Sequence, residues 1–299
     1  MNIHNGISIG VIGYLEVNNF PKFFESFLKN IRLFDQNIPL QIYFIFDELS
    51  PADQERLQLE INQAGFLDCK IICNPQRIGK INAINLFLKE SKYDFCIISN
   101  MDVILGEDVL KNLTCALAEN PEIGMIGPRI GPLDPERIPS ATLRRIINTL
   151  WDLHHQLSLI KPKISEVIGF KKRFINLPLV GLDDLIIEEL VSKSGLKIQY
   201  LPSKHVYTRV PLSWKEYLSQ RRRISAQYIN YSLKRNYRAS TRDLKIWHKF
   251  LLRHNLNLTK VVSIILLMLI EAYALMLGLC DNFRGRDLLK WPAINTTKQ

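Results

Sequence analysis

The chain has little of what would mark it as a secreted or zinc-binding protein. It has only five cysteines, an odd number, and none of them form the CxxC pairs of zinc sites; they are Cys69, Cys73, Cys96, Cys115 and Cys280. Such a scattered set argues against a disulfide framework and favours a reducing compartment. The first residues carry no basic region before their apolar stretch, so residues 7–12 are expected to form a first strand and not a signal peptide.

Acidic residues are scarce only in the last third of the chain. Residues 201–299 hold 18 Lys and Arg against 5 Asp and Glu, whereas residues 1–200 hold 21 against 24 and are nearly neutral. The hydrophobic content of 47% excludes a disordered chain and is sufficient for a full core. A basic excess confined to the C-terminal third fits a surface facing anionic lipid or phosphate, and no nucleic-acid partner is expected.

One long apolar run, Val261 to Leu279, lies within this basic third and is interrupted chiefly by Ser263 and Glu271. The run reaches the length that spans a bilayer. A central carboxylate costs about 2 to 3 kcal/mol on insertion scales, which is tolerable but unfavourable. The run predicts association with a membrane surface, as a span or as an interfacial helix. A buried oligomerisation helix is the alternative, so a homo-oligomer stays possible.

Short β-rich runs alternate with helical patterns from the start of the chain as far as Ile126. Strands are expected at 7–12, 41–46, 70–73, 95–99 and 123–126, and helices near 20–33, 51–64, 81–91 and 107–119. This alternation predicts an α/β fold with a mostly parallel sheet flanked by helices. Further on we expect a long loop at 127–139, strands at 165–170 and 197–201, and helices at 143–160, 183–193 and 214–235.

Polar residues directly after the strands are the first candidates for a ligand site, because ligands bind outside the carboxyl ends of parallel strands. They are Glu16, Asp47, Asn74 to Arg77 and Asn100 to Asp102. Asp102 follows a buried strand, where a carboxylate is costly unless it is paired or metal-bound. It is therefore a candidate ligand of Mg²⁺ or Mn²⁺, with a turn or helix-capping role as the alternative.

A glycine and a cation, Gly79 and Lys80, open a predicted helix shortly after Arg77. The backbone N–H groups of a helix start, together with Lys80, favour a diphosphate, although a Gly-Lys helix start is common. Asp47 and Glu48 follow the second strand. A carboxylate there can recognise a base or ribose, or belong to a solvated loop.

Two later groups carry the chemistry of group transfer: Gly181 to Asp184, and Gln220 to Ile224. A sugar hydroxyl is a poor nucleophile near neutral pH, so a positioned carboxylate is needed to remove its proton. A departing nucleoside diphosphate builds negative charge that a metal and arginines stabilise. Helix capping by the aspartates and a solvated face for the arginines are the alternatives.

Histidines near these groups give weaker signals. His154 and His155 point about 100° apart on a helix and cannot easily face one metal ion, so a solvated or partly buried pair is expected. His205 follows Lys204 and is a further candidate for a position near the site.

In order and spacing, these groups resemble a family-2 glycosyltransferase of the GT-A fold over about residues 7–225. The matching elements are Asp47, GKxxAxN at Gly79 to Asn85, a DxD-like element at Asn100 to Asp102, an xED-like element at Leu182 to Asp184, VYTRVP at Val206 to Pro211, and a QxxRW-like element at Gln220 to Ile224.

This resemblance implies a role for each matching residue. Asp102 would bind the metal, Mn²⁺ or Mg²⁺, and Asp184 would be the catalytic base. Asp47 would contact the donor nucleotide, and Gln220 with Arg223 would line the diphosphate and acceptor region. Together with the residues of the glycine and cation segment and of the DxD-like element, the expected donor-binding set is Asp47, Arg77, Gly79, Lys80, Asn100, Gln220 and Arg223.

Two positions depart from the family pattern. Asn100 stands where DxD has its first acid; it can coordinate through its carbonyl oxygen but contributes no charge, which would weaken metal binding. Ile224 stands where QxxRW has its tryptophan, so the aromatic platform for an acceptor sugar is missing. The second departure favours addition of a single sugar over processive polymer synthesis.

These observations predict a GT-A domain over residues 1–238, with a donor half of about 1–128 and an acceptor half of about 129–238. Residues 239–299 are expected to form a helical, partly membrane-associated extension containing 261–279. The expected reaction is inverting transfer from a nucleotide-sugar, by resemblance a UDP-sugar, to a glycan or lipid-linked acceptor. We expect it at the cytoplasmic face of the plasma membrane, in polysaccharide or cell-envelope biosynthesis.

Two other functions stay open. One is a nucleotidyltransferase of similar fold, against which the late Asp-Asp and Gln-x-x-Arg elements argue. The other is a catalytically silent nucleotide-sugar-binding or scaffold protein, suggested by Asn100 and Ile224.

Overall fold

The computed structural model describes residues 6–14, 17–35, 37–65, 68–179, 182–237, 243–253 and 257–286. The strands are β1 (Ile7–Tyr14), β2 (Leu40–Asp47), β3 (Cys69–Asn74), β4 (Phe95–Asn100), β5 (Val103–Leu105), β6 (Ile123–Pro132), β7 (Val167–Lys171) and β8 (Lys197–Thr208). The α-helices are α1 (Phe20–Ile31), α2 (Pro51–Gln63), α3 (Lys80–Glu90), α4 (Val109–Glu119), α5 (Ala141–Ile160), α6 (Asp183–Lys193), α7 (Trp214–Arg235), α8 (Leu244–Arg253) and α9 (Leu258–Phe283). Short 3₁₀ turns occur at Val17–Asn19, Pro135–Arg137 and Lys172–Phe174.

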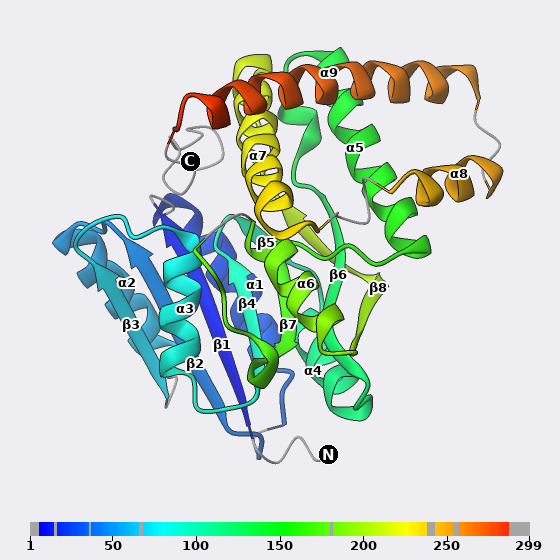
Figure 1. The fold of residues 1–299 in the computed structure, drawn as a ribbon. Helices are drawn as coiled ribbons and strands as arrows, with labels where there is room; N and C mark the ends of the chain where they lie inside the picture. The colour runs from blue at the N-terminus through cyan, green and yellow to red at the C-terminus, as the bar shows by residue number, and fades with distance from the viewer. Residues whose placement is uncertain are drawn as a thin grey trace.

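All eight strands form one sheet in the order β3-β2-β1-β4-β7-β6-β8-β5 (Figure 1). The first four of these are parallel, as the sequence predicts. The other half is mixed, because β7 runs antiparallel to β4 and β6, and β5 runs antiparallel to β8. In the parallel half Ile12 pairs with Asn100 and Tyr14 with Asp47. The carboxyl ends of β1, β2 and β4 therefore meet at one edge.

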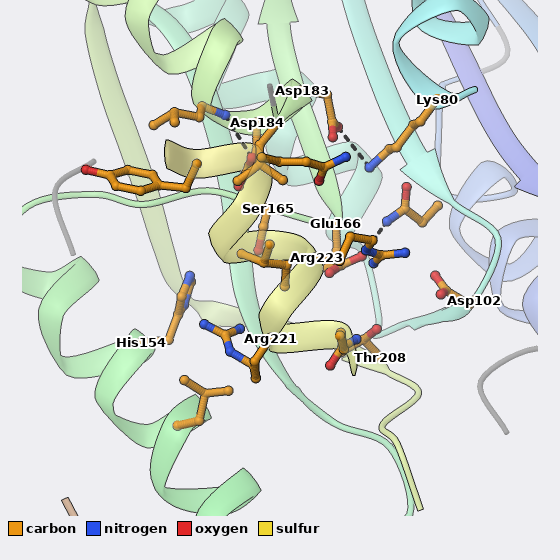
Figure 2. A pocket seen from close by; sticks show the side chains of 18 of the residues that line it. Lys80, Asp102, His154, Ser165, Glu166, Asp183, Asp184, Thr208, Arg221 and Arg223 are labelled. Atoms are coloured by element: carbon orange, nitrogen blue, oxygen red, sulfur yellow. Dashed lines mark hydrogen bonds and ion pairs between the residues drawn. The ribbon is translucent and has the colours of Figure 1, made fainter. Parts of the chain in front are cut away.

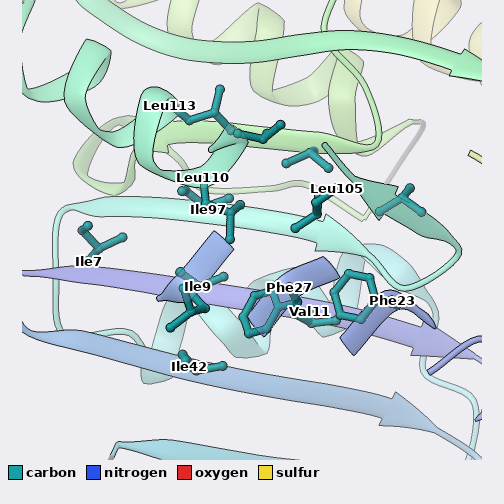
Figure 3. Packing of buried hydrophobic residues seen from close by; sticks show 14 of the residues in the cluster. Ile7, Ile9, Val11, Phe23, Phe27, Ile42, Ile97, Leu105, Leu110 and Leu113 are labelled. Carbon is teal, nitrogen blue, oxygen red and sulfur yellow. The ribbon is translucent and has the colours of Figure 1, made fainter. Parts of the chain in front are cut away.

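Alternating side chains of the strands fill two apolar layers, one on each face of the sheet. On one face Ile7, Ile9 and Val11 of β1 pack against α1 and α4 through residues such as Phe23 and Leu110 (Figure 3). On the other face the core continues into α3, α6 and the end of α7. Because helices cover both faces of the sheet, the sequences of the strands are nearly continuous apolar runs, which is typical of parallel sheets between helices.

Three features of the chain differ from the sequence prediction. The expected loop at 127–139 is wrong in its first half, because β6 continues to Pro132 and pairs with β8, with Ile130 opposite Val206. The short strand β5 was not predicted; it has only three residues and is defined by its pairing with β8. The strand expected at 197–201 is longer than predicted, because β8 continues to Thr208. Glu16 and Gly181, both named as candidates, lie outside the described residues.

The C-terminal helices form a third layer with α5 and α7, with an apolar core of its own. Figure 1 shows α9 lying across α7 and α5 at the end of the molecule opposite the N-terminus. The close crossing depends on Gly278, because a Cβ there would meet the backbone nitrogen of Ala226 at 2.7 Å. Among the described residues, α9 is the one helix long and apolar enough to cross a membrane.

Candidate active site

A cleft of about 710 Å³ opens at the carboxyl ends of β1, β2 and β4 and extends under α5, α7 and α9. Figure 2 shows charged side chains from α3, the start of β7, α6 and α7 converging on it. The residues expected to act as the base, the metal ligand or the donor-binding groups all line this cleft: Asp47, Arg77, Gly79, Lys80, Asn100, Asp102, Asp184, Gln220 and Arg223.

The buried carboxylate of Asp47 organises the loop that leads into α3. Its Oδ1 accepts from Asn74 Nδ2 at 3.0 Å, and its Oδ2 accepts from the backbone N–H groups of Ile78 at 3.1 Å and Gly79 at 2.9 Å. Gly79 has a positive φ, in the region that favours glycine. Two of the N–H groups expected to face a diphosphate are thus engaged by Asp47, which leaves the first turn of α3 and Lys80 for that role.

Arg77 lies in the same loop and stacks its guanidinium on the ring of Tyr14, 4.0 Å from the ring centre. Tyr14 is the last residue of β1 and also lines the cleft. A cation held over an aromatic ring keeps a fixed direction. Arg77 is therefore held at the end of the cleft next to β1.

Asp102 lies past the end of β4 and carries a buried oxygen, Oδ1, for which the described residues provide no hydrogen-bond partner. Burial raises its pKa, while Lys80, and more weakly Arg223 and Arg209, draw it down. An unpartnered buried carboxylate oxygen is costly unless something else binds it. The residue therefore fits the expected role of an oxygen ligand to Mg²⁺ or Mn²⁺.

Glu166 is a cleft residue that the sequence analysis did not single out as a candidate. It lies directly before β7 and accepts a short hydrogen bond on Oε2 from Asn100 Nδ2. Burial, and next the neighbouring Asp102, raise its pKa to about 7. The strand expected at 165–170 would include Glu166, but β7 begins one residue after it. An acid at a strand start facing the end of β4 is the signal that could have identified it.

The two aspartates at the start of α6 have different partners. Asp183 Oδ2 lies 2.8 Å from Lys80 Nζ, and Asp184 Oδ2 lies 2.8 Å from Lys163 Nζ (Figure 2). Lys163 also lies 3.3 Å from Glu188 Oε2, one turn further along α6. Burial alone would raise the pKa of Asp184, but Lys163 and then Lys80 hold it below its usual range. Asp184 is therefore an ionised carboxylate over a wide pH range.

Further along the cleft, His154 and Arg221 face its interior (Figure 2). Burial, and then Lys163, lower the pKa of His154 to about 4, so the ring is neutral near pH 7. His155 is not among the residues lining the cleft and has its Nδ1 2.8 Å from Tyr200 Oη. His205 is not among the residues lining the cleft and stacks on Tyr207.

The far end of the cleft is apolar and is bounded by α9. Its walls include Leu150, Trp151, Trp247, Leu267 and Leu275. Arg221 at the boundary makes a bidentate pair with Glu271 of α9, with Nη2 2.8 Å from Oε2. Ile224 also lines the cleft, so the position of the missing tryptophan faces the same space. The cleft thus has a charged end near Asp102 and an apolar end near α9.

No protein-family model matches the sequence, and a search of curated proteins gives no match either. Solved structures do match. A mannosyltransferase from Pyrobaculum calidifontis, in complex with GDP-Man and Mn²⁺, is 15% identical with a TM-score of 0.59, covering 93% of this chain and 74% of its own.

Two further structures show the same likeness at 15% identity. Glucosyl-3-phosphoglycerate synthase from Mycobacterium tuberculosis, in complex with Mg²⁺ and uridine diphosphate, has a TM-score of 0.51 and covers 75% of this chain and 78% of its own. Residues 1–349 of S. aureus TarS have a TM-score of 0.50, with 90% and 81% covered. These likenesses confirm the GT-A fold implied by the sequence resemblance.

Proposed function

We propose that the protein is an inverting, divalent-cation-dependent glycosyltransferase that takes its sugar from a nucleotide-sugar, by family resemblance a UDP-sugar. The observation that carries the proposal is the convergence of separate sequence elements on one cleft, where the unpartnered oxygen of Asp102 lies among Lys80 and Arg223. The fold is the one shared with the glycosyltransferases above, two of which were solved with a nucleotide ligand and Mn²⁺ or Mg²⁺.

In this proposal the donor lies over the carboxyl ends of β1, β2 and β4. Asp47 holds the loop of Arg77 and Gly79 in place and faces the nucleoside, while Arg77, Lys80 and Arg223 neutralise the diphosphate. Asp102 and Asn100 would hold Mn²⁺ or Mg²⁺ through oxygen atoms. Such a cation stabilises the charge that develops on the leaving diphosphate. Gln220 lies on α7 one turn before Ile224 and bounds the same space from the acceptor side.

Asp184 is the proposed base. It lies in the cleft at the start of α6 and is ionised, which is the form that a base needs in order to take a proton from an acceptor hydroxyl. Asp183 is bound to Lys80 and has the role of fixing that cation. The acceptor then approaches from the side of α5, α7 and α9, opposite the donor.

The apolar end of the cleft favours a lipid-linked acceptor over a free glycan. The outward face of α9 supports a membrane surface as the place of reaction, because Leu258, Ile265, Leu269, Met276 and Phe283 are all exposed on it. The acidic residues of α9 turn inward, Glu271 to Arg221 and Asp281 to Arg222. A helix held this way lies along the membrane surface and does not span it, which fits its long apolar face.

Ligand-dependent stabilisation tests the proposal. UDP and GDP should raise the melting temperature in the presence of Mn²⁺, because a ligand that binds only the native state stabilises it. Asp102→Ala should lose the Mn²⁺-dependent part of the shift, whereas Asp68→Ala, at an exposed site, should keep it. If the melting temperatures of the parent and of Asp102→Ala rose equally with Mn²⁺, Asp102 would not be a ligand of the cation.

A further inference from the structure

The element Asn100 to Asp102 supplies only one acidic side chain, yet the structure brings a second carboxylate to it from the residue directly before β7. Glu166 and Asn100 are joined by two hydrogen bonds. The backbone N–H of Asn100 donates to the Glu166 carbonyl at 3.1 Å, and the Asn100 amide donates to Glu166 Oε2. The register of β4 against β7, with Ser99 opposite Val167, brings these two residues together.

The backbone at Glu166 also sets it apart. Its φ is positive, in the left-handed region that residues other than glycine seldom adopt. Such conformations persist where surrounding structure enforces them, and they cluster at functional sites. Here the turn directs the side chain into the cleft, beside Arg223 in Figure 2, instead of along the strand.

The neighbours of Glu166 define what its carboxylate can do. It lies close enough to Asp102 for the two charges to repel, and Lys80 provides only part of the compensation. The Asn100 amide nitrogen is turned to Glu166, so the amide oxygen lies on the other side of the same group. Two carboxylates and an amide oxygen form the type of oxygen set that Mg²⁺ and Mn²⁺ prefer.

We infer that Glu166 is a second carboxylate ligand of the cation bound by Asp102, replacing the acid that Asn100 does not provide. The inference rests on the proposed function, because it assumes a cation at Asp102. In this arrangement Asn100 does not lower the negative charge of the site. The site keeps two carboxylates, Asp102 and Glu166, and the second one lies beside β7 instead of within the Asn100–Asp102 element.

Mn²⁺ binding to the full chain, without nucleotide, tests this inference. Free Mn²⁺ can be counted by electron paramagnetic resonance. Glu166→Gln keeps the shape and the amide contact but removes the charge, so the dissociation constant for Mn²⁺ should rise by about tenfold or more. Glu122→Gln, at an exposed site paired with Lys197, is the matched control and should bind like the parent.

A charge-swap variant separates ligation from positioning. Asn100→Asp in the Glu166→Gln background moves the acid back to the family position and should recover most of the lost affinity. Unchanged Mn²⁺ binding by folded Glu166→Gln would overturn the inference, as would a double variant that stays as weak as Glu166→Gln at an unchanged melting temperature. Absence of Mn²⁺ binding in the parent would instead overturn the cation dependence of the proposed function together with it.

Discussion

At the scale of single residues, the chemistry depends on which cation neutralises which carboxylate. Lys80 pairs with Asp183 and Lys163 pairs with Asp184 and Glu188, all within one partly buried cluster. Adjacent aspartates in the sequence therefore have separate partners, and we propose separate roles for them.

Asp184→Asn should reduce transfer by about 10²-fold or more while donor affinity stays nearly unchanged, because the amide keeps the shape but cannot take a proton. Steady-state turnover and donor binding measured side by side check this. Asp183→Asn is the paired variant: it should weaken donor binding, since Lys80 loses its partner. If Asp183→Asn lost turnover while Asp184→Asn stayed active, the assignment would be reversed.

Lys163→Met should destabilise the fold by about 3 to 5 kcal/mol, because it leaves Asp184 and Glu188 without their buried cation. Urea unfolding near pH 7 measures this loss. In the parent the lowered pKa of Asp184 gives stability that is present above its unfolded value of about 3.9 and lost as pH falls through the lower folded value.

The same variant should change the pH profile of turnover. Without Lys163 the pKa of Asp184 rises, so the acid limb of the profile should move to higher pH than in the parent. Lys197→Met, which removes an exposed pair with Glu122, is the control. It should change neither the free energy of unfolding nor the pH at which turnover falls on the acid side. An unmoved acid limb in a folded Lys163→Met protein would mean that Asp184 is not the titrating base.

The sequence identifies site residues where the chemistry is local and misses them where packing creates it. Asp102 is recognisable because a carboxylate directly follows an apolar run. Glu166 and Lys163 are not, since their partners, Asn100 and Asp184, belong to other elements that lie far from them along the chain. Their roles arise from the antiparallel insertion of β7 beside β4 and from the contact of its preceding loop with α6.

At the scale of elements, α9 is a wall of the active site as well as an apolar surface. Glu271 pairs with Arg221, Asp281 pairs with Arg222, and Leu267 and Leu275 line the cleft. Truncation at Asn257 would therefore remove more than a membrane contact. It would leave two arginines of α7 unpaired and open the apolar end of the cleft.

Point variants on the outward face of α9 avoid that problem. Ile265→Gln, Leu269→Gln and Met276→Gln combined should release the protein from membranes without unfolding it, because these side chains are at least half exposed. Flotation with vesicles containing anionic lipid measures the release. Leu59→Gln with Leu233→Gln, on α2 and α7, changes exposed leucines elsewhere and should float like the parent. A parent chain that stays with the soluble fraction would contradict the membrane assignment.

The boundaries of the helices and strands show why most of the fold could be predicted from the sequence. The amphipathic and apolar periods place α6 and α7 at the observed residues, and Ser50 caps α2 by accepting from the Asp53 N–H. The second half of β6 has the composition of a loop, because it contains Gly127, Pro128, Gly131 and Pro132. Its strand conformation depends on pairing with β8, a partner distant in the sequence, so local composition could not reveal it.

At the scale of the whole molecule, the cleft joins a charged end to an apolar end under a helix with an exposed apolar face. This polarity is the reason for proposing an acceptor with a sugar or phosphate head and a lipid tail. It also accounts for the charge distribution, since the basic excess of residues 201–299 includes the arginines of α7 that face the cleft.

Product analysis of donor turnover distinguishes glycosyl transfer from nucleotidyl transfer and from mere binding. Full-length protein is incubated with a UDP-sugar or a GDP-sugar and Mn²⁺, and the products are separated by anion-exchange chromatography. The account predicts nucleoside diphosphate in equal amount to released or transferred sugar, with loss of the reaction in Asp102→Ala and Asp184→Asn. Release of pyrophosphate would instead identify a nucleotidyltransferase, and no turnover of any donor, with a lipid-phosphate acceptor present, would contradict catalysis at this site.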